Sequence, residues 1–213
     1  MPAFTTPGPI TATVAVAGAR VRLIASDRTD TVVLVEPVDR TSESDVRVAD
    51  RTRVDFAGGR LSVRTTVSGA AGGSVAITIA LPVGSGLVAY LARSDVRAEG
   101  SLGECELHLA SGRVVLDRVD AVQATISTGE VVIGHVTGDA EVSSGSGAVD
   151  IGHVTGDADV SSGSGAVDIG RADGGVTART GGGAIRIGRL TRGRANHPGG
   201  TDALSPAARA TTT

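Results

Sequence analysis

A unit of eighteen residues that repeats almost unchanged is the feature that most limits how this chain can fold. The sequence IGHVTGDAEVSSGSGAVD, residues 133–150, is followed directly by IGHVTGDADVSSGSGAVD, residues 151–168, and the two differ only at Glu141 and Asp159. A looser copy covers residues 169–186, and a fourth begins at Ile187. A short fixed period is typical of solenoids, in which each unit buries its apolar side chains only against its neighbours. The repeat therefore predicts that residues one period apart lie in columns.

The apolar positions of the repeat predict the core. We expect inward-facing columns that share one register position in successive turns, and we expect Glu141, Ser143, Asp150 and His153 to face water. One turn cannot fold alone, because five modest apolar side chains do not offset the entropy of ordering eighteen residues. The predicted core residues of the repeats are Val131, Ile133, Val142, Val149, Ile151, Val154, Val160, Val167, Ile169, Ile185 and Ile187, joined by Ala140.

The predicted fold is all-β: a right-handed, single-stranded β-helix, or β-solenoid, with turns of about eighteen residues. Glycines recur at residues 112, 129, 147, 165 and 183, each before a short apolar strand, and no proline lies between Pro82 and Pro198. An uninterrupted hydrogen-bond ladder requires such a stretch without proline. We expect regular repeats over residues 95–190, continuous as one domain with less regular β-windings over residues 10–94.

The less regular half carries its own strand signals. Residues 10–16, 19–25, 31–36 and 74–80 read as strands, and a hairpin is predicted at Gly58-Gly59 between residues 54–56 and 61–63. The charged segment 38–53 is expected to be an exposed excursion around a short strand over residues 45–48, and no helix is predicted. Residues 1–9 and 191–213 are expected to be disordered tails because they hold prolines and small polar residues without alternation.

Composition narrows the possible partners and the location. The formal net charge is −3 over 213 residues, which gives no reason to expect a nucleic acid or an acidic membrane surface as partner. No stretch approaches the ~18 apolar residues of a membrane span. The first ten residues lack the pattern of a secretory signal, so the cytoplasm is the expected location, with an extracytoplasmic one if the start site lies further upstream.

From Ser74 onward the chain resembles the bacterial putative-adhesin family of β-strand repeats, a domain of unknown function of the actinobacterial type. The resemblance is carried by SVAITIALPVGSGL (74–87), ASGRVVL (110–116), STGEVVIG (127–134), GSGAVDIG (145–152 and 163–170) and GGGAIRIG (181–188), and ARVRLIASDRTDTVVLVEP (19–37) is similar to the family's opening strands. The match covers about residues 10 to 190. It implies a β-solenoid and no catalytic residues. The chain departs from the family pattern at its end, where a further strand pair is often found, and in lacking an export signal.

Stacked carboxylates are the first candidate site. The unit GSGAVDIG is similar to the glycine- and aspartate-rich repeats that bind calcium inside β-rolls, but Asp150 and Asp168 stand one position later than in those repeats. They are therefore expected to face outward, where they are weak candidates for a surface cation. Simple solvation is the favoured alternative, because salt screens like charges at this spacing. No metal site or cofactor is predicted.

The other chemically active side chains also have structural explanations. His135 and His153 could share a transition metal, but no third ligand recurs in register, so an exposed turn position is favoured. The pairs Ser143-Ser144 and Ser161-Ser162 are read as turn residues, because no base is placed beside them. Cys105 is the only cysteine, so no disulfide forms within the chain, and it is read as a small core residue.

These observations favour a protein that is not an enzyme. The leading hypothesis is an adhesin-like binding or scaffold module that presents a repetitive β-solenoid face to a macromolecular partner, or associates with itself through that face or through an end. The first alternative is a self-assembling cytoplasmic scaffold similar to the bactofilins. The second is a polysaccharide-processing enzyme on a β-helix similar to the pectate lyases, which is disfavoured because the turns are too short to build a cleft.

Overall fold

The computed structural model describes residues 2–65, 73–191, 195–196 and 202–204, and they are almost entirely β-structure. The first elements are β1 (Ala3–Thr5), β2 (Thr11–Ser26), β3 (Asp30–Pro37), α1 (Glu43–Asp50), β4 (Thr52–Ala57), β5 (Arg60–Thr65) and β6 (Val75–Pro82). They are followed by β7 (Gly86–Val136), β8 (Ala140–Ser146), β9 (Val149–Val154), β10 (Ala158–Ser162), β11 (Val167–Ala172), β12 (Val176–Thr180), β13 (Ile185–Leu190), β14 (Ala195–Asn196) and β15 (Asp202–Leu204). The helix is too short and too polar to span a membrane, and it is the only helix in the described part of the chain.

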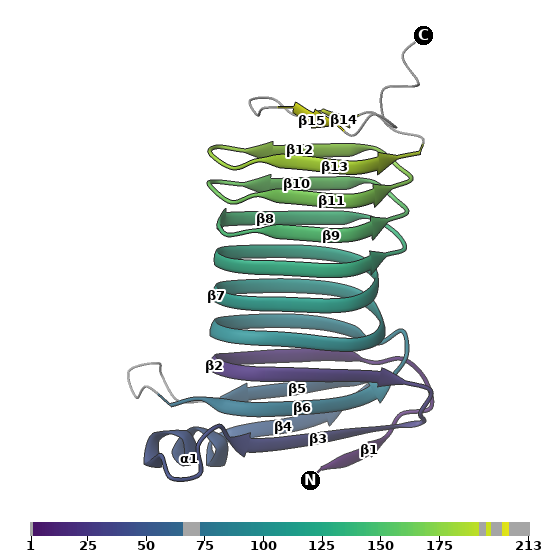
Figure 1. Ribbon diagram of the computed structural model, residues 1–213. Coiled ribbons are helices and arrows are strands. Elements are labelled where there is room, and N and C mark those ends of the chain that lie inside the picture. The colour runs from purple at the N-terminus through teal and green to yellow at the C-terminus, as the bar shows by residue number, and fades with distance from the viewer. Residues whose placement is uncertain (1, 66–72, 192–194, 197–201, 205–213) are drawn as a thin grey trace.

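All fifteen strands belong to one sheet that folds back on itself. From β7 the sheet divides into two branches: β8, β10, β12 and β14 pair in one, and β9, β11, β13 and β15 pair in the other. Figure 1 shows these branches as the two sides of flattened windings that lie one upon another, with the 51-residue strand β7 forming several of them. The core therefore lies between the two sides of the windings.

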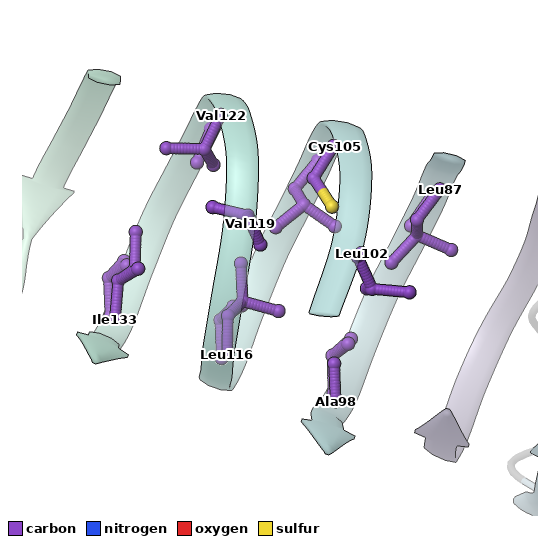
Figure 2. Close-up of a cluster of buried hydrophobic side chains, with 14 of the residues drawn as sticks. Leu87, Ala98, Leu102, Cys105, Leu116, Val119, Val122 and Ile133 are labelled. Atoms are coloured by element: carbon purple, nitrogen blue, oxygen red, sulfur yellow. The ribbon is translucent and has the colours of Figure 1, made fainter. Parts of the chain in front are cut away.

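The pairing along the windings is parallel and keeps the same residues together. Val142 pairs with Val160 between β8 and β10, and Ile151 pairs with Ile169 between β9 and β11, so in both cases the partners are eighteen residues apart. Ile169 in turn pairs with Ile187. Their side chains, with those of Val131, Ile133, Val149 and Val167, fill the space between the two branches and are at most 3% exposed. Figure 2 shows the same kind of packing in the preceding windings, which β7 forms, around Leu102, Leu116 and Val119.

Glycine at one corner of each winding allows the windings to touch through their backbones. A Cβ atom added to Gly147 would fall on the carbonyl oxygen of Gly129, one winding below, and the same overlap recurs at Gly165 and Gly183. Gly147 also has a φ of 150°, which residues with a side chain rarely adopt. The corner is therefore closed to every residue except glycine.

A buried hydroxyl group secures the same corner from inside. The Ser162 hydroxyl accepts a hydrogen bond from the Gly165 amide (2.9 Å) and lies 3.4 Å from the carbonyl oxygen of Gly147. Thr180 makes the equivalent contacts one winding later, with Gly183 N (3.0 Å) and Gly165 O (3.1 Å). The Ser144 hydroxyl stands at the equivalent position one winding earlier, yet it is buried without a hydrogen-bond partner in the described structure. The prediction that these serine pairs lie in turns is wrong, because they belong to strands β8 and β10, where alternation turns one serine of each pair inward.

The predicted hairpin is confirmed, but the first residues differ from the expectation. Strands β4 and β5 pair antiparallel across Gly58 and Gly59, both of which have positive φ. Residues 3–5, expected within a disordered tail, instead form β1 and pair antiparallel with β3. Phe4 stacks on Phe56 of β4 with the ring centroids 5.0 Å apart, so an aromatic contact offsets the cost of ordering this short strand. Together β1, β3 and β4 close the N-terminal end of the stack.

The prediction of a strand over residues 45–48 is wrong, because these residues lie in helix α1. Ser42 is the N-cap, and its hydroxyl accepts a hydrogen bond from the Asp45 amide. The buried Asp45 carboxylate accepts bonds from the Asp39 amide (3.0 Å) and the Ser74 amide (2.8 Å), which fixes the helix beside β6. The charge of the segment suggests an exposed excursion, whereas Ser42 at the N-cap position is the helix signal available in the sequence.

Five residues of the C-terminal segment also differ from the expectation of disorder. The short strands β14 and β15 extend the parallel pairing of β12 and β13. They satisfy part of the backbone edge that the last full winding would otherwise expose. Most of the segment 191–213 lies outside the described residues.

Replacing Gly147 with alanine tests the glycine corner. Because the new methyl group must displace backbone in the neighbouring winding and the backbone has a positive φ, we expect Gly147→Ala to lower the free energy of unfolding by about 3 kcal/mol. Gly182→Ala is the matched control, since its Cβ would meet nothing closer than Ser164 Cα at 3.9 Å. Urea denaturation followed by circular dichroism measures both. Equal stability of the two variants would contradict the argument.

The near-identical copies provide an internal test of the corner hydroxyl. Ser162→Ala leaves the Gly165 amide without the partner described above, so we expect a loss of about 1–3 kcal/mol in unfolding free energy. Ser144→Ala removes a buried hydroxyl that has no partner, and we expect it to be neutral or stabilising. Thermal unfolding of the two variants measures the difference. A larger loss for Ser144→Ala would show that the corner is held in another way.

Candidate binding surface

The core residues proposed from the sequence lie inside the windings, and the proposed carboxylates lie on the outer surface. All eleven predicted core residues of the repeats are buried, with the largest exposure, 6%, at Ile185. Asp150 and Asp168 pair in register on the outside of β9 and β11, and Arg186 follows Asp168 in β13. Desolvation, the charge of Asp168 and that of Glu130 raise the pKa of the Asp150 carboxyl. No group of three or more metal-ligating side chains occurs in the described residues, and a surface cation at this pair stays a prediction.

The two histidines lie against each other, and His153 contacts an acidic residue, Asp173, that was not predicted from the sequence. The rings of His135 and His153 meet edge to face with centroids 4.5 Å apart, and His153 Nε2 lies 3.0 Å from a carboxylate oxygen of Asp173. Asp173 also pairs with Arg171 (3.0 Å), and the His153 hydrogen bond is the main cause that lowers its pKa to about 2. Asp173 stands where the first two copies carry a threonine, and this departure from the repeat was the signal available in the sequence.

This cluster does not form a nucleophilic relay. The hydroxyl of Thr155 lies 3.5 Å from His135, whereas Asp173 contacts the other histidine, so no single imidazole joins a hydroxyl to a carboxylate here. Burial of Cys105 raises the pKa of its thiol to about 12, which keeps it protonated at neutral pH. Figure 2 shows this cysteine among apolar side chains, in keeping with a core role.

A different surface, centred on Tyr90, has the features of a binding site. The alternation of β7 places Ala89 and Leu91 inward and Tyr90 outward, where the tyrosine is 49% exposed. Its ring stacks on that of His108 from the next winding, with centroids 5.1 Å apart and planes within 3° of parallel. We call this side of the windings the Tyr90 face; its other outward residues around the ring include Ala15, Val88, Glu106, Gln123 and Thr125.

Glu106 fixes the two rings in place. Its Oε1 atom accepts a hydrogen bond from the Tyr90 hydroxyl (3.1 Å) and lies 2.9 Å from His108 Nε2. The bond to Glu106, followed by the charge of that carboxylate, raises the pKa of Tyr90, and contacts with His108 and Tyr90 lower the pKa of Glu106. The result is a preorganised pair of parallel rings on an otherwise flat sheet. Tyr90 was not among the candidate residues proposed from the sequence, and its exposed position on β7 is a finding of the structure.

A groove with a volume of about 390 Å³ runs beside the rings. Val88 and Ala121 are the partly exposed apolar side chains of its lining, whereas Leu87 and Val122 beneath it point into the core. The carboxylates around it belong to Glu104, Glu106, Asp139 and Glu141, and Gln123 adds an amide that donates to Glu141 at 3.3 Å. No arginine or histidine is among the residues that line it. The groove therefore places a small apolar surface and several carboxylates beside an aromatic platform, which is a suitable form for a polar binding site.

On the other side of the windings, exposed carboxylates form ion pairs with arginines. There Arg22 and Arg97 both contact Glu99, at 3.0 and 3.1 Å, and Arg113 contacts Glu130 at 3.1 Å. These exposed pairs neutralise one another at the surface, although each contributes little to stability. The Tyr90 face is thus distinguished both by its exposed aromatic ring and by carboxylates that lack such arginine partners around the groove.

Comparison with known proteins shows what the chain shares with solved structures. No protein-family model and no curated protein matches the sequence. A structure described as a "putative adhesin" from Bacteroides fragilis is 14% identical, with a TM-score of 0.57 over 92% of this chain and 94% of that one. A "putative adhesin" from Parabacteroides distasonis is 12% identical, with a TM-score of 0.54 over 93% and 94%. At these identities the likeness establishes a shared fold.

The ionisation of Tyr90 tests its contact with Glu106. Because loss of the phenolic proton places a second negative charge beside the carboxylate and removes a donated hydrogen bond, we expect Tyr90 to titrate above the usual pKa of about 10. Glu106→Gln should bring the titration down toward that value. The chain has one tyrosine and no tryptophan, so an ultraviolet absorbance titration reports this residue alone. An unchanged midpoint in the variant would contradict the contact.

Proposed function

We propose that this protein is a non-catalytic, adhesin-like binding module that presents the Tyr90 face to a macromolecular partner. The observation that carries the proposal is the exposed Tyr90–His108 stack, held by Glu106 on a flat sheet beside a groove. Large, rigid aromatic side chains supply much contact area at low entropic cost, and they dominate many binding interfaces. The fold shared with structures described as putative adhesins supports the same class of function.

The architecture we propose for the module is a right-handed β-solenoid with eighteen-residue turns, built as one domain over residues 10–190. Parallel partners eighteen residues apart support the repeat length. The single domain is supported by β2, which pairs with β7 from Thr11–Gly86 to Ile24–Glu99 and so crosses the division at residues 94–95. The shared fold and the sequence resemblance support membership of the putative-adhesin family, and the actinobacterial type rests on the sequence resemblance alone.

The chemistry of the described side chains supports a role in binding without catalysis. Cys105 is protonated and buried, and the histidine cluster lacks a relay through one ring. The carboxylates around the groove also disfavour a polyanion such as nucleic acid, because like charges would meet at close range. We therefore place the function in the recognition of a partner that is neutral or positively charged.

A self-assembling scaffold receives less support. Head-to-tail filaments require two complementary ends. The C-terminal end continues in parallel pairing through β14 and β15, but the N-terminal end closes with antiparallel strands β1 and β3. The two ends therefore differ in kind, which disfavours an open-ended stack.

The proposal is tested by binding of the full chain to a defined panel of immobilised cell-surface polymers, both polysaccharides and matrix proteins, measured by biolayer interferometry. We expect at least one polymer to bind without being cleaved. Tyr90→Ala should weaken that binding about tenfold or more, because a central aromatic residue contributes about 1.4 kcal/mol or more. Val83→Ala is the control, since Val83 is comparably exposed (44%) but lies away from the groove lining. Absence of binding, insensitivity to Tyr90→Ala, or release of polymer fragments would contradict the proposal.

A further inference from the structure

The groove beside Tyr90 combines an apolar wall with negative charge. Val88 and Ala121 are its partly exposed apolar side chains, and Glu104 and Glu141 stand at its edge with exposed side chains. A partner group that matches both parts needs an apolar stem and a cationic head. Lysine and arginine side chains have this composition, because their methylene groups can lie along an apolar surface while the charged end reaches carboxylates.

The carboxylates around the groove retain acceptor capacity. The contacts of Glu106 with Tyr90 and His108 all involve Oε1, and Oε2 has no partner among the described residues. Glu141 accepts only the amide of Gln123, at 3.3 Å, within the same part of the chain. An ionised carboxylate offers about four acceptor positions. A cationic donor would therefore find free oxygen atoms at two places along the groove.

The aromatic stack has one open side. One ring face of Tyr90 meets His108, whereas the next position of the sheet, on β2, is occupied by Ala15. This alanine and its neighbours Ala17 and Ala92 line a shallow depression of about 590 Å³ against the tyrosine ring. Because their side chains are small, a flat group can lie over Ala15 and continue the stack on Tyr90. Arg64 of β5 pairs with Ala15 from the other side and is exposed, so such a group would lie between the tyrosine ring and this arginine. The guanidinium group of arginine is planar and stacks on aromatic rings in this way.

We propose that the Tyr90 face binds an extended, arginine-containing polypeptide segment of a partner protein, with one guanidinium group stacked on Tyr90 over Ala15 and a neighbouring cationic side chain in the carboxylate-edged groove. This inference rests on the proposed function of the Tyr90 face and adds the chemistry of the partner. Arginine is favoured over lysine because it alone provides both a planar face for the ring and a donor fork for a carboxylate. A neutral sugar could stack on the ring but would leave the charge of the groove unmatched.

The test uses the full chain and fluorescently labelled octapeptides that alternate serine with arginine, lysine or glutamine, with fluorescence anisotropy as the readout. We expect the arginine peptide to bind about two- to fivefold more tightly than the lysine peptide, as one exposed cation–π stack implies. The glutamine peptide should not bind measurably. Affinity for the arginine peptide should fall as salt is raised through the range where exposed charges become screened.

Matched variants locate the binding site. Tyr90→Ala should remove the preference for arginine over lysine, and Glu141→Gln should weaken both cationic peptides about two- to fivefold. Val83→Ala and Glu43→Gln alter an exposed apolar residue and an exposed acid elsewhere, and both should bind like the unmodified chain. Circular dichroism of each variant verifies that the fold is intact, which is expected because Tyr90 and Glu141 are exposed.

The possible results separate this inference from the proposed function. Equal affinities for the arginine and lysine peptides, or binding that Tyr90→Ala leaves unchanged, would overturn the inference. Tyr90-dependent binding of a neutral polysaccharide without binding of the arginine peptide would also overturn it, while leaving the proposed function in place. If neither the peptides nor the polymer panel bind, both fail together.

Discussion

The close approach of backbone to backbone at the glycine corners is the contact on which the rest of the structure depends. The carbonyl oxygen of Gly129 occupies the place that a side chain of Gly147 would need, and the same contact continues through Gly165 and Gly183. Because the corners meet without side chains between them, the windings can keep the strand spacing of a parallel sheet, about 4.8 Å. That spacing holds equivalent residues in register, so that Val142 and Ile151 meet their counterparts one winding later. The columns of the core follow from the corners.

The same register is unfavourable at the surface, because a repeated sequence places identical side chains, and therefore like charges, beside each other. Asp150 beside Asp168 is one result: desolvation and, after it, the charge of Asp168 raise the pKa of the Asp150 carboxyl. The chain relieves such columns where the repeat becomes irregular: Arg186 follows Asp168, and Asp173 replaces a threonine next to His153. The Tyr90–His108 stack also lies outside the near-identical copies. Chemical variety, and with it the capacity for specific binding, is thus concentrated where the repetition breaks down.

The part of the fold that the repeats form could be predicted from the sequence. The repeats specify which residues share a register position, and the alternation within each copy separates buried from exposed side chains. Periodicity gave no information about α1, whose Ser42 cap depends on three neighbouring residues, or about β1, which is ordered by a contact between Phe4 and the distant Phe56. The candidate site was missed for a related reason. Tyr90 and Glu106 are brought together by a winding that no repeat marks, so only the structure shows that they form one surface.

A stack of flat windings also determines the kind of partner that such a surface can serve. Side chains on one sheet face project in parallel, about 4.8 Å apart between strands and ~7 Å apart along a strand, so they form a flat, regular array rather than a closed cleft. They can instead meet a partner that is itself extended and that offers groups at regular intervals. On the Tyr90 face the ring, the carboxylate of Glu106 and the groove next to it follow one another across adjoining windings. An extended polypeptide with alternating side chains has nearly the same spacing, and for this reason we favour a linear partner over a compact small molecule.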